Sequence, residues 1–113
     1  LGRLDAALEA MSRAHELDPE DGDIAMALGL LARDLDKEDV ATRAFRAITV
    51  MRTVPPGAPD GTTVGAKALS YYYLAQMAMV KGDARRARVM AEKAIAEDGT
   101  LEEARDLLAS LRL

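Results

Sequence analysis

Cysteine and tryptophan are absent from this sequence, and the remaining aromatic residues are scarce, with three tyrosines and one phenylalanine. Without cysteine the chain can form no disulfide, no thiolate metal site and no cysteine nucleophile. Sheets favour β-branched and aromatic residues, whereas alanine, which makes up about a fifth of this chain, favours closely packed helices. A single histidine, His15, leaves little material for acid–base catalysis.

Basic residues are also in the minority, with 15 against 19 acidic residues and a formal net charge of −4. Nucleic-acid-binding domains are usually basic, so we expect no nucleic-acid partner. The longest apolar run, residues 68–80, is interrupted by tyrosines and Gln76 and is shorter than the ~18 residues of a membrane span. No signal-peptide pattern is visible at the start. We therefore expect no membrane insertion, and the 113 residues leave room for a single domain.

Apolar residues recur at helical spacing along almost the whole chain, in six stripes that predict six helices. Between two of them, Lys81-Gly82-Asp83 predicts a glycine helix end followed by an acidic N-cap. Asp21 or Asp23 can cap the second helix, and Thr100 with Glu103 predicts a capping box for the last. The stripes begin at Leu4, Ile24, Val40, Val64, Ala84 and Leu101.

Two residue patterns repeat along the chain. Gly2-x4-Ala7-x3-Met11-x2-Ala14 recurs from Asp36 and again from Gly82, at offsets of 34 and 46 residues. Leu28-Gly29-x2-Ala32 recurs from Leu74 and in part from Leu108, at offsets of 46 and 34 residues. Both series indicate a 34-residue unit with one insertion of about 12 residues, in the interval that contains the Pro/Gly-rich segment 53–63.

These patterns resemble the tetratricopeptide repeat (TPR) family, whose 34-residue unit is a pair of antiparallel helices. The resemblance implies an all-α fold, a right-handed α-solenoid of antiparallel helix pairs with about six helices. Asp36 replaces the family's turn glycine, and Ala91 replaces its aromatic residue. The expected organisation of the single domain 1–113 is the second helix of a truncated repeat (1–19), a repeat (22–53), an insertion loop (54–63), a repeat (64–99) and a C-terminal capping helix (101–113).

Catalytic and cofactor sites are not expected. His15 has no serine or cysteine companion, and histidine is favoured in the last turn of a helix by the helix dipole. The acidic clusters around Asp21 and Asp36 flank turns without the register of a calcium loop. The basic stretch predicts a solvated outer face, with an acidic partner as the alternative; its residues are Lys81, Arg85, Arg86, Arg88 and Lys93.

The resemblance places the first helix of each unit along a concave face that binds a protein or peptide. Their spacing places each of two sets of side chains on one side of its helix. Methionine and tyrosine at such positions favour binding of an amphipathic helix or an extended peptide. The alternative is that neighbouring units bury these side chains. The candidate groove residues are Met26, Leu30, Arg33, Leu69, Tyr72, Gln76 and Met79.

The resemblance therefore predicts a non-catalytic protein–protein interaction module without cofactor or metal. The alternative is a structural or assembly segment of a larger repeat protein that self-associates through its open ends. The first helix would then lack its pair partner, and its side with Leu4, Leu8 and Met11 would be partly bare. In that case a homo-oligomer of the isolated chain is expected.

Overall fold

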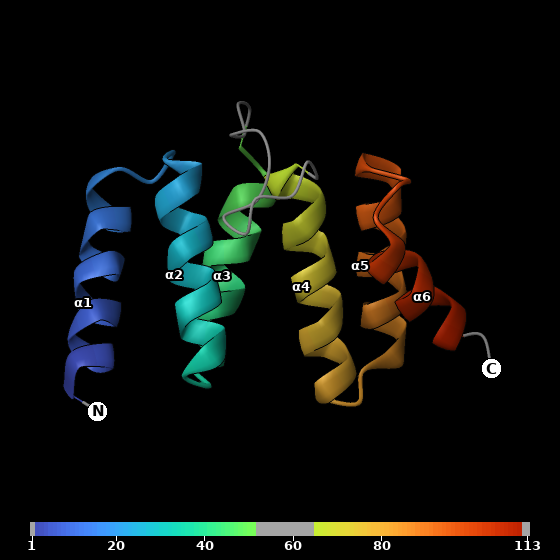
Figure 1. The fold of residues 1–113 in the computed structure, drawn as a ribbon, viewed down its shortest axis with the longest axis horizontal. Coiled ribbons are helices and arrows are strands. Elements are labelled where there is room, and N and C mark those ends of the chain that lie inside the picture. Colours follow the sequence, from blue (N-terminus) through green and yellow to red (C-terminus); the bar gives the residue numbers. More distant parts are fainter. Residues whose placement is uncertain (1, 52–64, 112–113) are drawn as a thin grey trace. The chain divides into compact units, whose positions relative to one another are not determined.

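The computed structural model describes residues 2–51 and 65–111. These residues form six α-helices and no strand, which confirms the predicted all-α class (Figure 1). The predicted insertion loop 54–63 lies outside the described residues, as do residues 1 and 112–113. The helices are α1 (Gly2–Leu17), α2 (Gly22–Asp34), α3 (Glu38–Thr49), α4 (Ala66–Val80), α5 (Ala84–Glu97) and α6 (Glu102–Ser110).

The chain divides into two compact units, which are described one at a time. In unit 1, Leu1–Pro55, α2 contacts both α1 and α3. In unit 2, Pro56–Leu113, α5 contacts both α4 and α6, and α6 also contacts α4. The most extensively packed antiparallel pair of each unit is the hairpin α2·α3 or α4·α5, closed by a short turn (Figure 1).

The two hairpin turns have the same hydrogen bonds at positions 46 residues apart. In unit 1, Asp36 N–H donates to the Arg33 carbonyl and the following N–H to the Ala32 carbonyl. In unit 2, Gly82 N–H donates to the Met79 carbonyl and the following N–H to the Ala78 carbonyl. This Schellman arrangement needs a left-handed residue; Asp36 has φ 59° and Gly82 has φ 81°. The predicted glycine turn after Lys81 is thus confirmed.

Helix starts show which polar residues cap and which do not. The Asp21 carboxylate accepts from two backbone N–H groups of α2, and the Asp83 carboxylate accepts from one of α5. The capping box predicted for the last helix is wrong, because Leu101 is the N-cap of α6. Thr100 lies one residue too early, and its hydroxyl instead donates to Asp98 Oδ1 at 2.6 Å.

The core of the α2·α3 pair is built around Phe45, whose ring is fully buried. A Cβ atom at Gly29 would lie 2.6 Å from Phe45 Cε1, so the ring occupies the space that a side chain on α2 would need. The glycine therefore lets the two helices approach with the aromatic ring between them. The other buried side chains of α3 are Ala41, Ala44 and Ile48.

The core of the α4·α5 pair has no buried aromatic residue among the described side chains. Small residues line both helices, and Ser70, which is fully buried, donates its hydroxyl to the Ala66 carbonyl at 2.8 Å. That internal hydrogen bond satisfies the only buried polar side chain among the described residues. The buried alanines of this pair are Ala66, Ala68, Ala75, Ala78, Ala87, Ala91 and Ala94.

Candidate functional site

The three candidate residues on α2 occupy different environments. Met26 is only 1% exposed, so its predicted position on an open surface is wrong. The helices α1 and α3 both pack against α2, and Met26 belongs to the part of α2 that is buried. Leu30 and Arg33 are half-buried, and Arg33 Nη2 lies 3.5 Å from the Asp34 carboxylate.

The four candidate residues on α4 are similarly divided. Leu69 is only 4% exposed and cannot contribute an open surface. Tyr72 and Gln76 are half-buried and joined by a hydrogen bond, in which Gln76 Nε2 donates to the Tyr72 hydroxyl at 2.8 Å. Met79, one turn further on, is 40% exposed. The structure therefore brings Tyr72, Gln76 and Met79 together along one side of α4.

Two more exposed or half-buried residues, which sequence reasoning missed, extend this side of α4. Val80 is 90% exposed, and the Tyr73 ring lies 5.7 Å from the Tyr72 ring, centroid to centroid. The missed signal was the composition of α4, in which Lys67 is the only charged residue. A helix that is apolar on all sides is normally buried on all sides, but α4 is not. We call Tyr72, Tyr73, Gln76, Met79 and Val80 the α4 strip.

The predicted basic stretch lies at the turn before α5 and along that helix. Arg85, Arg86 and Arg88 are exposed, and no ion pair joins Arg88 to Glu92 although their spacing would allow one. Lys93 Nζ lies 5.8 Å from the Tyr71 ring centroid, close enough for a cation–π interaction. These side chains form a solvated surface, as the sequence indicated.

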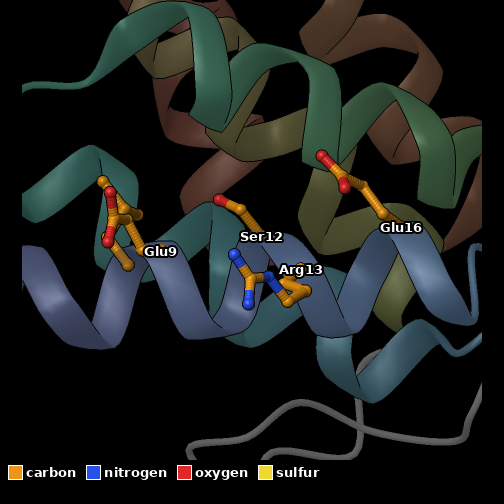
Figure 2. A pocket seen from close by; sticks show the side chains of 5 residues that line it. Glu9, Ser12, Arg13 and Glu16 are labelled. Carbon is orange, nitrogen blue, oxygen red and sulfur yellow. The ribbon is translucent and has the colours of Figure 1, made fainter.

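A shallow hollow on α1 is lined by side chains of that helix alone. Figure 2 shows Ser12 and Arg13 within it, with Glu9 and Glu16 on either side; Leu8 completes the lining. On the same helix, His15 Nδ1 is buried and has no hydrogen-bond partner. In the described part of the chain, no group of three or more histidine or acidic side chains is arranged to hold a metal ion.

The Asp98 carboxyl group accepts two hydrogen bonds from Thr100. The Thr100 hydroxyl, and then the Thr100 backbone N–H, donate to the Asp98 carboxylate and hold its pKa below the usual value. This pair lies in the turn between α5 and α6. The two hydrogen bonds stabilise this turn, and Thr100 therefore binds Asp98 and does not cap α6.

No protein-family model matches this sequence, and no curated protein matches it significantly. None of the helices in residues 2–51 and 65–111 has the length and apolar character needed to cross a membrane. The α4 strip is therefore assessed from its own chemistry: partly exposed aromatic and aliphatic groups around one polar pair.

Proposed function

We propose that this chain is a non-catalytic, TPR-like protein–protein interaction module, and that the α4 strip binds a peptide or an amphipathic helix. The observation that supports this most is the partly open apolar side of α4. Met79 and Val80 are exposed there, and one turn earlier Gln76 donates a hydrogen bond to the Tyr72 hydroxyl. Apolar surface of this kind favours a partner that buries it.

The chemistry of the strip suits a mixed apolar and polar ligand. Tyrosine offers a large rigid surface at small conformational cost, and methionine adapts to irregular side chains. The Gln76 amide carbonyl is an acceptor that a ligand N–H group can use, since its NH2 group already donates to Tyr72. On α2, the half-buried Leu30 and Arg33 of the predicted groove offer a smaller surface of the same kind.

The TPR-like solenoid arrangement is part of this proposal. It is supported by the 34-residue period of the sequence and by the identical hydrogen bonds of the two hairpin turns. In TPR proteins the first helix of each hairpin contributes the binding surface, which agrees with the partly open side of α4.

The test is selection of binding peptides from a displayed random library, followed by affinity measurements on variants. Tyr72→Ala should weaken the selected peptides by about tenfold or more, as expected for an aromatic anchor, and should leave the melting temperature nearly unchanged. Val89→Ala is the matched control, because Val89 is also 40% exposed but lies on α5. Failure to select any peptide, or equal affinity for the Tyr72→Ala variant, would contradict the proposal.

A further inference from the structure

The apolar side of α1 is partly exposed to solvent, whereas the equivalent residues of α3 and α5 are fully buried. Ala7, Met11 and Ala14 are only half-buried, and no residue of α1 is fully buried. Their counterparts in the repeated pattern are all 0% exposed: Ala41, Phe45 and Ile48 in α3, and Ala87, Ala91 and Ala94 in α5. The residues at these positions are apolar in all three helices, so residue type does not explain the difference in burial. The difference arises because α3 and α5 are each covered by the preceding helix.

The covering element is known for both closed cases. In unit 1 it is α2, whose Gly29 lies directly against Phe45, and in unit 2 it is α4, whose Ala75 is at the corresponding position and fully buried. Both covering helices have leucine immediately before the small residue and alanine three residues after it. The small residue lets the two helix axes come close, which a longer side chain would prevent.

The partly exposed side of α1 is apolar and uncharged, as is needed for contact with such a helix. Leu4 is 48% exposed, and from Leu4 to Ala14 this side carries no charged residue. Leu8 lies at the edge of this side, because it also borders the hollow of Figure 2, whose other lining residues are Glu9, Ser12, Arg13 and Glu16. We call Leu4, Ala7, Leu8, Met11 and Ala14 the α1 strip.

In a second copy, none of α2, α4 and α6 offers a suitable cover. α2 and α4 already cover α3 and α5. α6 carries the Leu108-Ala109 pattern, but its exposed Glu102, Arg105 and Asp106 stand where α2 has Gly22, Ala25 and Met26, all buried. Packing these charges against the uncharged α1 strip would cost more than the apolar contact returns.

We propose that the α1 strip is a docking site for a partner helix that runs antiparallel to α1, with glycine or alanine opposite Met11 and leucine just before it. Such a helix would close the strip as α2 closes Phe45. This site is independent of the α4 strip and lies on a different helix, so failure of one proposal leaves the other standing.

The probe is a labelled synthetic peptide with the sequence of residues 21–35, which supplies both the Asp21 cap and the Gly29 contact, titrated with the 113-residue chain. Fluorescence anisotropy should show saturable binding. Gly29→Leu in the peptide should weaken it by about tenfold, because the added side chain holds the helices apart. In the protein, Met11→Asp should weaken it as much, while Ala10→Asp, on the exposed side of α1, should not.

Three results would overturn the proposal. The first is that the peptide does not bind, and the second is that it binds the Met11→Asp chain as well as the unchanged chain. The third is that sedimentation without peptide shows a dimer that Met11→Asp abolishes and Ala10→Asp does not, which would make a second copy the occupant. Circular dichroism of both variants checks that α1 remains helical.

Discussion

The hairpins α2·α3 and α4·α5 share one turn geometry but fill the space between their helices differently. In α2·α3 a glycine on the first helix faces the Phe45 ring of the second. In α4·α5 the corresponding positions are Ala75 and Ala91, and both are fully buried. The second pair has three tyrosines on its first helix, none of them fully buried, and Tyr71 stands where α2 has Ala25. The comparison teaches that the repeat specifies where the helices end and where the two helices of a hairpin come close. The sizes of the side chains that each helix places at this contact can vary.

The turns themselves also differ in residue type. Unit 2 places glycine at the left-handed position and an aspartate cap directly after it, at Gly82 and Asp83. Unit 1 has Asp36 and Lys37 there, and Lys37 makes no side-chain cap hydrogen bond. Aspartate tolerates the left-handed region less well than glycine does. Unit 1 therefore adopts the same turn with two less suitable residues.

The largest expected effect comes from breaking the Gly29–Phe45 pair. Phe45→Ala should lower the free energy of unfolding by about 3–5 kcal/mol, because it empties a fully buried site. Gly29→Ala should cost about 1–3 kcal/mol, because the new methyl group meets the ring. Together they should cost less than their sum, since the methyl enters space that the ring has left. Urea denaturation of all four proteins measures this coupling.

The matched control for that cycle lies in unit 2. Ala75→Gly, alone and combined with Phe45→Ala, should give additive losses, because the two sites belong to different helix pairs. Additive losses for Gly29 and Phe45 as well would contradict the close contact between them.

An intermediate effect is expected from transferring the turn of unit 2 into unit 1. Asp36→Gly combined with Lys37→Asp should raise the free energy of unfolding by about 1 kcal/mol, through relief of backbone strain and a new N-cap. The reverse exchange, Gly82→Asp with Asp83→Lys, should lower it by a similar amount. A Cβ atom at Gly82 meets no atom within 4 Å, so strain and not a clash is tested. Thermal melts with equal midpoints would argue against this account.

The smallest effect concerns the turn between α5 and α6. It has the same backbone hydrogen bonds as the turn between α1 and α2, with Asp18 and Glu20 at the places of Asp98 and Thr100. Since the pKa of Asp98 is below its usual value in the folded chain, its contribution to stability is present above the usual aspartate pKa and is lost as the pH falls through the folded pKa. Thr100→Val should raise the Asp98 pKa toward its usual value, and Thr100→Ser should keep it low. NMR titration of the Asp98 carboxyl carbon distinguishes these results, and an unchanged pKa in the valine variant would refute the role of the hydroxyl.

Local features of the fold could be predicted from the sequence, while the exposure of the candidate groove residues could not. Helical periodicity, the Asp21 cap and the turn at Gly82 all depend on a few neighbouring residues, and all agree with the structure. Thr100 was misjudged because Asp98, two residues earlier, competes for its hydroxyl.

Exposure depends on which helices lie beside a residue, and apolar spacing alone does not identify them. Met26 fits the spacing of a groove residue, yet it is buried in α2, which packs against both α1 and α3. Tyr73 and Val80 belong to none of the predicted apolar stripes. Their place in the α4 strip follows only from the side of α4 that the structure leaves partly exposed. For the α4 strip, the sequence therefore identified Tyr72, Gln76 and Met79 but not its full extent.

The contact between Gly29 and Phe45 also imposes an order on evolutionary change. A lineage moving from the glycine–aromatic pair toward an alanine–alanine pair like that of unit 2 must shrink the ring first, since a methyl group at position 29 has no room beside it. In the opposite direction, the alanine must become glycine before an aromatic residue can appear on the second helix. Homologous sequences should accordingly contain glycine with a small partner far more often than alanine with phenylalanine.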